Sequence, residues 1–261
     1  MQENFWRKLL RELTNVLLTV AALLALWEAA ARLHLYDVSF FPPPSADANA
    51  LFSSVKSGEL ISDTWMSLRR ALVGFIAGSC VGAAAGILTG RLRIVDSTLG
   101  QVIRVLRSIP TIALVPLAIV WFGLGETSKY LLVFWGVFFP VWVSSHIGAA
   151  QVDQTFIWAA RSLGANTWRL LCEVILPGAA PHIIGGMRTG IATAFVVLMA
   201  AEMTGAFGGL GYRIYVSHLV FRVDKMVVDI VVLGAIGALT DVVFASIISL
   251  IPWSPESAKR I

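Results

Sequence analysis

Charged side chains are scarce in this chain of 261 residues. Asp, Glu, Lys and Arg make up only 14% of it, whereas 57% of the residues are hydrophobic. The mean hydropathy is +0.78. A water-soluble domain with so few charges would expose wide apolar patches. We therefore expect lipid to cover much of the surface, and the composition disfavours the soluble enzyme classes.

Cysteine and histidine, two usual ligands of metal ions, are scarce, with two and four residues. The two cysteines, Cys80 and Cys172, lie far apart and show no C-x-x-C or Cys/His spacing. The histidines are isolated and form no H-E-x-x-H motif; they are His34, His146, His182 and His218. We therefore expect neither a disulfide nor a bound metal.

A phosphate-binding loop is absent as well. No lysine follows a glycine, so the chain contains no G-x-x-x-x-G-K-[ST] motif. The chain therefore cannot bind ATP in that way, and any ATP-driven step needs a nucleotide-binding partner. The net charge of +4 requires no nucleic acid, because cytoplasmic loops of membrane proteins are enriched in Lys and Arg.

Long apolar stretches are what the sequence does contain. A helix that crosses the hydrocarbon core needs about 20 mostly apolar residues. Six such segments predict an all-α membrane protein with a single transmembrane domain over residues 1–261. The predicted spans are residues 13–31, 71–90, 108–125, 130–152, 181–204 and 227–251.

Six crossings place both termini on one side of the membrane. The larger share of the 20 Lys and Arg residues falls on that side, which the positive-inside rule identifies as the cytoplasm. The alternative for the first segment is a secretory signal peptide, because basic residues precede it and the run Ala29 to Ala31 resembles a cleavage site.

Small residues and prolines mark places where the spans can pack or bend. Pro110 and Pro116 lie in the third span, where kinks either shape a cavity or fit neighbouring helices. Glycines at every fourth position of the second span predict a face that allows close helix contact. These glycines are Gly74, Gly78, Gly82 and Gly86.

Charges within spans are costly and usually face protein or water. Glu202 precedes the run Gly205 to Tyr212, whose glycines permit a broken or re-entrant backbone. A role at an outer gate is one interpretation of Glu202, and anchoring of this backbone by hydrogen bonds is the other. For Arg188 and Asp241 the sequence favours packing or an interfacial position. The candidates for a gate or a path through the membrane are Glu202, Gly205, Gly209, Gly211, Pro110 and Pro116.

Residues 153–177 follow the fourth span and should lie in the cytoplasm. Residues 158–163 and 167–176 contain good helix formers; Gly164 permits a turn between them, and Pro177 ends the second piece. This pattern predicts two short helices at an angle. Their apolar side chains beside Arg161 and Arg169 suit a docking element for another protein. A helix lying on the membrane surface is the alternative.

Small residues in this segment follow a distinctive spacing: Ala159-Ala160, then Gly164, then Ile175-Leu176-Pro177. The pattern resembles the EAA loop of permease subunits of ATP-binding-cassette (ABC) importers, with Trp158 where the motif has glutamate. Further motifs resemble the nitrate, sulfonate, taurine and bicarbonate branch of these permeases. They are Ser67-Leu68-x-Arg70, Arg107-Ser108-Ile109-Pro110, Trp121-Phe122-Gly123-x-Gly125, and Ala201-Glu202 followed by Gly209-Leu210-Gly211.

The resemblance implies a type I importer permease fold with a cytoplasmic coupling helix, and a chain that is not itself catalytic and binds no cofactor. The implied partners are a second, identical permease copy, two ATPase subunits that hold ATP and Mg²⁺, and an extracytoplasmic solute-binding protein. The implied place is the bacterial inner membrane, and the implied activity is import of a small anion. The residues implied in ATPase coupling are Ala159, Ala160, Arg161, Leu163, Gly164, Trp168, Arg169, Ile175 and Pro177.

The residues alone leave two other classes open. An ion-driven secondary transporter would bind H⁺ or Na⁺ through broken spans and buried carboxylates, and would work without an ATPase. An intramembrane enzyme would need a nucleophile, a base and an orienting group, and the sequence shows no recognisable arrangement of these.

Overall fold

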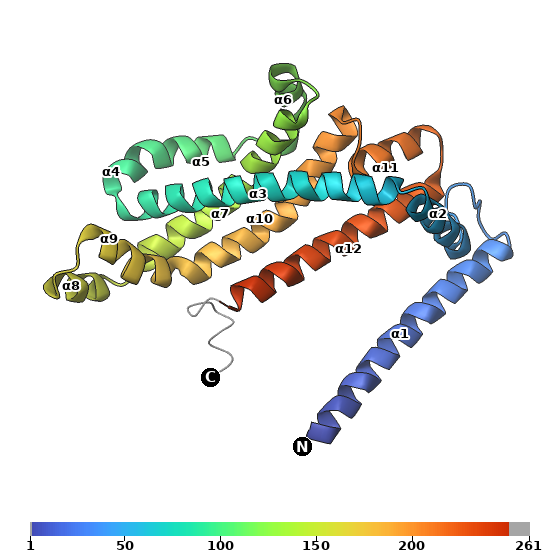
Figure 1. Ribbon diagram of the computed structural model, residues 1–261, viewed down its shortest axis with the longest axis horizontal. Coiled ribbons are helices and arrows are strands. Elements are labelled where there is room, and N and C mark those ends of the chain that lie inside the picture. Colours follow the sequence, from blue (N-terminus) through green and yellow to red (C-terminus); the bar gives the residue numbers. More distant parts are fainter. Residues whose placement is uncertain (1, 251–261) are drawn as a thin grey trace. The chain divides into compact units, whose positions relative to one another are not determined.

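The computed structural model describes residues 2–250, with side chains at residues 11, 14, 15 and from 18 onward. This part of the chain is helical almost throughout and contains no β-strand, which confirms the predicted all-α class (Figure 1). The predicted end of the sixth span, Ile251, and the basic residues Lys259 and Arg260 lie outside the described residues.

The helices follow one another with short connections. In chain order they are α1 (Gln2–Arg32), α2 (Pro44–Lys56), α3 (Glu59–Arg91), α4 (Arg93–Val95), the π-helix η1 (Asp96–Gly100), α5 (Gln101–Arg107), the 3₁₀-helix η2 (Thr111–Leu114), α6 (Val115–Phe122), α7 (Glu126–Gln151), α8 (Gln154–Ser162), α9 (Thr167–Arg169), the π-helix η3 (Leu170–Ile175), α10 (Leu176–Gly205), α11 (Leu210–Leu219) and α12 (Val223–Ile248).

The described chain forms two compact units. The smaller contains residues up to 61 together with 214–231, and the larger contains residues 62–213 and those from 232 onward. The predicted single domain over residues 1–261 stays a prediction. Both candidate sites described below lie within the larger unit.

Helices α7 and α10 form the centre of the larger unit (Figure 1). Val133, Val137 and Val141 of α7 are completely buried, and they cluster with Ile191 and Leu198 of α10. Such burial of apolar side chains supplies the packing energy of the helix pair.

Glycines hold α3 close to α7. A Cβ atom at Gly78 would lie 2.7 Å from the carbonyl oxygen of Phe134, and one at Gly82 would lie 2.8 Å from that of Phe138. Real Cβ atoms essentially never approach other heavy atoms so closely. The glycine face predicted for close helix contact is therefore confirmed, and it packs on the backbone of α7.

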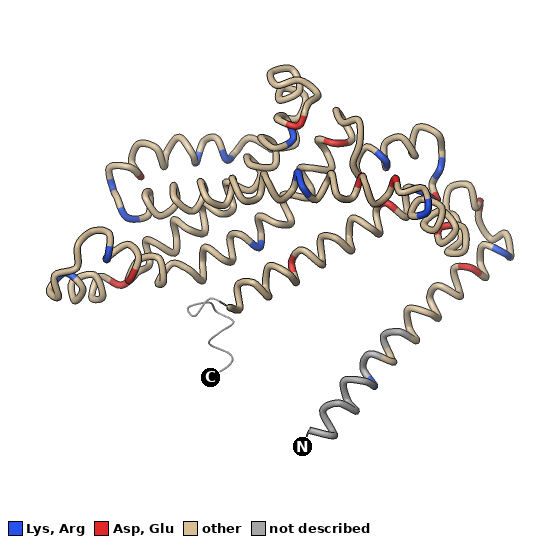
Figure 2. The backbone as a smooth tube through the Cα atoms, viewed as in Figure 1, with Lys and Arg blue, Asp and Glu red and all other residues tan. Residues whose placement is uncertain are grey.

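Among the residues that the structure describes, four stretches are long and apolar enough to cross a membrane: α3, α7, the continuous helix Thr167–Gly205, and α12. They correspond to the predicted spans 71–90, 130–152, 181–204 and 227–251. Figure 2 shows long uncharged stretches in these helices. The predicted first span lies in α1, where the side chains of Leu13, Val16 and Leu17 are not described. Its alternative as a signal peptide stays a prediction.

The predicted third span, residues 108–125, is not one continuous helix, and the break lies at Pro110, one of the two prolines at which kinks were expected. Helix α5 ends at Arg107, and the next helical segment, Thr111–Phe122, is bent by 84° relative to Arg93–Arg107. Pro110 stands at the bend in an extended conformation, and Pro116 lies in the first turn of α6, where proline is tolerated. The two prolines therefore belong to a broken segment and not to kinks within a helix.

The predicted end of the second coupling helix at Pro177 is also wrong. The helix continues from Thr167 through the π-helix η3 into α10, and Pro177 occupies the first turn of α10. Proline has no backbone N–H to donate to the preceding turn. That turn is the π-helix η3, whose wider spacing already interrupts the regular i→i−4 hydrogen bonds, so Pro177 does not end the helix. One helix thus runs from the coupling segment to Gly205.

In the smaller unit, Glu28 joins the end of α1 to the start of α2. Its carboxylate accepts hydrogen bonds from Arg32 Nε at 2.9 Å and from the backbone N–H of Ser45 at 3.1 Å. The connection between α1 and α2 ends in the three prolines Pro42, Pro43 and Pro44. Pro43 is the N-cap of α2, and Pro44 is its first residue. Pro44 is suited to this place, because its missing N–H has no partner in the first turn of a helix.

Candidate functional site

The coupling segment is built by local capping interactions. Asp153 caps α8 by accepting a hydrogen bond from the backbone N–H of Thr155 at 2.8 Å, and this bond lowers the pKa of the carboxyl below its ordinary value. Helix α8 ends in a turn in which Gly164 has φ +81°. Asn166 caps the following helix by accepting a hydrogen bond from the backbone N–H of Arg169.

Gly164 is the residue that makes this turn possible. A positive φ strongly favours glycine, and the N–H of Ala165 then reaches the carbonyl oxygen of Ala160 at 2.9 Å. The two helices are therefore separate and angled, as the sequence predicts, although the second begins at Thr167 and does not stop at Pro177.

Large apolar side chains point outward from this segment. Trp158, Leu163 and Trp168 are 64%, 88% and 70% exposed. Beneath them, Ile157 and Leu170 are buried in a cluster with Val152 and Ala179 at the adjoining ends of α7 and α10. The segment is therefore firmly seated on the spans while its other face is uncovered.

The predicted coupling residues fall into two groups. Ile175 is buried in the same cluster, while Ala160 and Pro177 are partly buried, so these three hold the segment in place. The other six lie on the exposed surface: Ala159, Arg161, Leu163, Gly164, Trp168 and Arg169.

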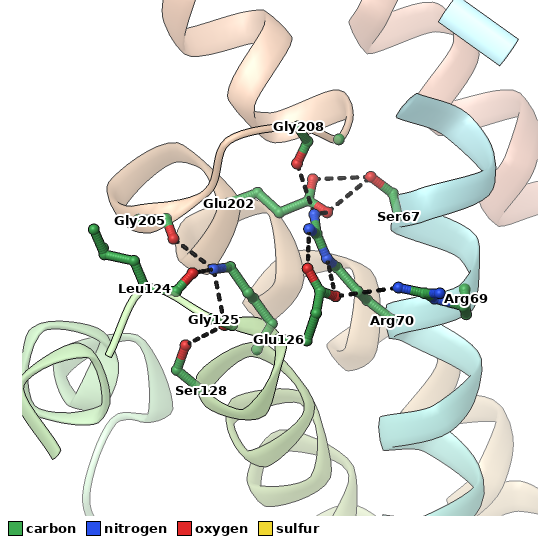
Figure 3. Close-up of polar contacts among 12 residues, drawn as sticks. Ser67, Arg69, Arg70, Leu124, Gly125, Glu126, Ser128, Glu202, Gly205 and Gly208 are labelled. Atoms are coloured by element: carbon green, nitrogen blue, oxygen red, sulfur yellow. Dashed lines mark hydrogen bonds and ion pairs between the residues drawn. The ribbon is translucent and has the colours of Figure 1, made fainter. Parts of the chain in front are cut away.

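A second candidate site is a buried polar network around Glu202 (Figure 3). Glu202 is completely buried near the end of α10. The Ser67 hydroxyl donates to its two carboxylate oxygens at 2.8 and 2.9 Å, and Nη1 of Arg70 donates at 2.7 Å. The backbone N–H of Gly211 donates at 2.9 Å. A buried carboxylate requires such partners.

Arg70 connects Glu202 to two other segments (Figure 3). Its Nη1 also donates to the carbonyl oxygen of Gly208 at 2.7 Å. Its Nε and Nη2 form a two-pronged pair with Glu126, the first residue of α7, at 2.8 and 2.5 Å. One guanidinium on α3 thus joins the start of α7, the end of α10 and the loop after α10.

Lys129 is a third buried charge at this end of the spans. Its Nζ donates to the backbone carbonyl oxygens of Leu124, Gly125 and Gly205, the last two at 3.0 and 2.5 Å. These carbonyls belong to the loop before α7 and to the C-terminus of α10, where a positive charge is favourable.

The glycines after Glu202 shape a tight loop between α10 and α11. Gly209 has φ +112°, and a Cβ on it would lie 2.5 Å from Oε1 of Glu202. A Cβ at Gly211 would lie 2.7 Å from the Cβ of Glu202, and one at Gly205 would lie 2.6 Å from the side chain of Ile119. The loop therefore wraps closely around the carboxylate.

These contacts describe how the predicted gate candidates are arranged. Glu202, Gly205, Gly209 and Gly211 lie together, and Gly205 approaches α6, which begins next to Pro116. The network makes Glu202 an anchor for the loop, and a role for it in gating stays a prediction. Pro110 lies apart in the chain, at the bend before η2.

This network was not predicted from the sequence. Ser67 and Arg70 entered the prediction only as part of a motif, and Glu126 and Lys129 were not among its candidate residues. A sharper signal was present, because both Arg70 and Lys129 adjoin apolar runs in which an uncompensated charge would be costly.

Arg188 and Asp241, two further charges within spans, form a pair with each other. They lie on α10 and α12 and belong to neither of the two sites described above.

Comparison with known proteins gives a consistent result. Residues 78–251 match the family described as "Binding-protein-dependent transport system inner membrane component". The taurine transport system permease protein TauC of Escherichia coli K12 is 34% identical, with 96% of this chain and 94% of TauC covered. The putative aliphatic sulfonates transport permease protein SsuC of Bacillus subtilis 168 is 33% identical, with 86% and 82% covered.

A solved structure shares the fold. The MetNI methionine ABC transporter, in an inward-facing conformation, has a chain that matches with a TM-score of 0.63 at 21% identity. The match covers 74% of this chain and 95% of that one. From its sequence and its helical fold, the chain belongs to the family of inner-membrane components of binding-protein-dependent transport systems, the permease subunits of ABC transporters.

Proposed function

We propose that this chain is the permease subunit of an ATP-driven importer that passes a small anionic solute from a binding protein into the cytoplasm by alternating access. The relatives named for taurine and aliphatic sulfonates favour a sulfonate-like solute, and nitrate and bicarbonate share its charge. The proposed assembly contains two identical permeases, two ATPases that hold ATP and Mg²⁺, and an extracytoplasmic binding protein. The proposed place is the bacterial inner membrane, with both termini cytoplasmic.

The exposed face of the coupling segment carries this proposal. Trp158, Leu163 and Trp168 present apolar surface beside Arg161 and Arg169, and buried aromatic anchors with arginine dominate the binding energy of many interfaces. We assign the ATPase to this face. Trp158 then supplies an apolar anchor where related loops carry a glutamate.

The helix from Thr167 to Gly205 provides a route for motion. It begins at the docking face and ends at the Glu202 network, with no break between them. When two ATPases close around ATP, a segment seated in each must move with its host, and the attached span tilts as a rod. A binding protein that contacts only one state shifts the same equilibrium.

Replacement of Ala159 by Glu tests the docking assignment. Ala159 is exposed on α8, so a long charged side chain should leave the permease folded and block the approach of the ATPase. Ala159→Ser is the matched control, because it stays small and uncharged. We expect Ala159→Glu to lose co-purification with the ATPase and ATP-coupled uptake, while size-exclusion chromatography shows an unchanged permease. Retention of both activities would show that the docking assignment is wrong.

A further inference from the structure

A charged pair joins two membrane spans away from both candidate sites. Arg188 of α10 donates from Nε to Oδ1 of Asp241 at 2.9 Å and from Nη2 to Oδ2 at 2.8 Å. Arg188 lies seven residues inside the predicted span 181–204, which is about 10 Å along a helix. Asp241 lies well inside α12. Both charges are therefore within the apolar part of their helices.

The pair is open on one side. The side chains of Arg188 and Asp241 are 47% and 41% exposed in the described chain. Charged groups within membrane spans are costly against lipid, and they normally face protein or a water-filled cavity. The two-pronged geometry fixes both side chains, so the exposed side requires water or another protein in the assembled transporter.

Small residues continue the same face of α10. Gly185 and Ala192 lie one turn before and one turn after Arg188, and both are exposed. A Cβ at Gly185 would meet no heavy atom within 4 Å. A solute next to the guanidinium would therefore have space on this face.

The chemistry of the pair suits an oxyanion. A guanidinium group offers a planar fork of N–H donors that matches the two oxygens of a carboxylate or phosphate. Sulfonate, nitrate and bicarbonate also present two neighbouring oxygens with negative charge. Such an anion can take the place of the Asp241 carboxylate on the guanidinium.

We propose that Arg188 contacts the solute in the translocation path, where it exchanges the Asp241 carboxylate for an oxyanion of the passing substrate. Asp241 holds the guanidinium in position when the path is empty. This inference rests on the proposed function and deepens it, because it assigns an anion contact within the permease and not in the binding protein.

Uptake by the complete transporter in liposomes provides the first test. We expect Arg188→Gln to lower uptake of the anionic substrate about tenfold, the effect of losing roughly 1.4 kcal/mol, while the loaded binding protein still stimulates ATP hydrolysis. Arg188→Lys should retain part of the uptake, because it keeps the charge. The exchanged pair, Arg188→Asp with Asp241→Arg, should stay inactive. Restoration of normal uptake by the exchanged pair would show that the ion pair only joins the two helices, and would overturn the proposal.

A reporter cysteine tests the site independently of transport. Ala192→Cys is placed in a chain in which Cys80 and Cys172 are replaced by Ser. Thiol reagents of opposite charge, sulfonatoethyl and aminoethyl methanethiosulfonate, are then applied to the assembled transporter, and each rate is divided by that reagent's rate with a free thiol in solution. On this scale we expect the anionic reagent to react about threefold faster or more, as Coulomb attraction predicts, and Arg188→Gln to abolish this preference. Arg188→Gln thus serves as the matched control at the same reporter position.

The outcomes separate this proposal from the proposed function. Reaction only after denaturation, or equal reaction with both reagents, would overturn the assignment of an anion contact at Arg188. Failure of every loaded binding protein to stimulate ATP hydrolysis would instead overturn the proposed function, whatever the reporter shows. Faster reaction with the anionic reagent that depends on Arg188 supports the proposal.

Discussion

Arg70 is the residue on which the buried network depends most. It is 2% exposed and pairs with both Glu202 and Glu126. Removal of one partner of a buried ion pair leaves an uncompensated charge and costs about 3–5 kcal/mol. Removal of the charge at Glu202 leaves Arg70 paired with Glu126. The single amide oxygen of a glutamine at this position can still accept from Arg70, and only the hydrogen bond from the N–H of Gly211 to the other oxygen is lost.

We therefore expect Arg70→Gln to lower the thermal stability of the purified chain far more than Glu202→Gln. Thermal unfolding in lipid nanodiscs measures both variants against the parent chain. An equal or larger loss of stability in Glu202→Gln would contradict the central place of Arg70. Full uptake by Glu202→Gln would also show that the charge of Glu202 is not essential for gating.

Gly209 has no room for a side chain. Its φ of +112° is unfavourable for other residues, and a Cβ would lie 2.5 Å from Oε1 of Glu202. We expect Gly209→Ala to reduce the yield of folded protein and its melting temperature. Gly237→Ala is the control, because a Cβ there would meet nothing within 4 Å and alanine favours a helix interior. Similar melting temperatures for the two variants would contradict this account of the loop.

At the scale of elements, the contact of α3 with α7 depends on the absence of side chains. A Cβ at Gly82 would lie 2.8 Å from the backbone oxygen of Phe138, so Gly82→Leu should force the two helices apart. Overpacking of this kind costs about 1–3 kcal/mol. The neighbouring Val81→Leu is the control, because Val81 is exposed. Thermal unfolding should rank Gly82→Leu well below Val81→Leu, and an equal ranking would count against close packing of these helices.

The helices were predicted with uneven success, for a physical reason. The glycine face of α3 was visible because its period of four residues follows the helix turn. The prolines indicated that the third span bends, but not that the bend is as sharp as 84°, because an apolar composition shows only that a segment avoids water. The extended backbone at Pro110 breaks the helix without adding a charge that would mark the break.

The prediction that Pro177 ends the second coupling helix was wrong for a related reason. Pro177 indicates a helix end when the helix around it is regular, but here the π-helix η3 precedes it and the chain continues as one helix. The Glu202 network was hidden for another reason. Arg70 and Glu202 are 132 residues apart in sequence, and only the packing of α3 against α7 and α10 brings their side chains together.

At the scale of the whole molecule, one continuous helix connects the coupling segment with the buried network around Glu202. One end of the Thr167–Gly205 helix carries the exposed Trp168, and the other is fixed by buried charges to α3 and α7. Movement of the coupling segment is therefore expected to move α10 together with the loop after Gly205. In the proposed assembly the ATPase supplies the energy for this movement.

The central claim is that this chain transports only as part of an ATP-driven assembly. The most direct measurement is ATP hydrolysis by the chain and its ATPase in lipid, with and without a binding protein loaded with taurine, nitrate or bicarbonate. We expect one loaded binding protein to stimulate hydrolysis, which would also name the substrate. A chain that binds no ATPase and takes up solute from an ion gradient alone would contradict the claim and support an ion-coupled secondary transporter.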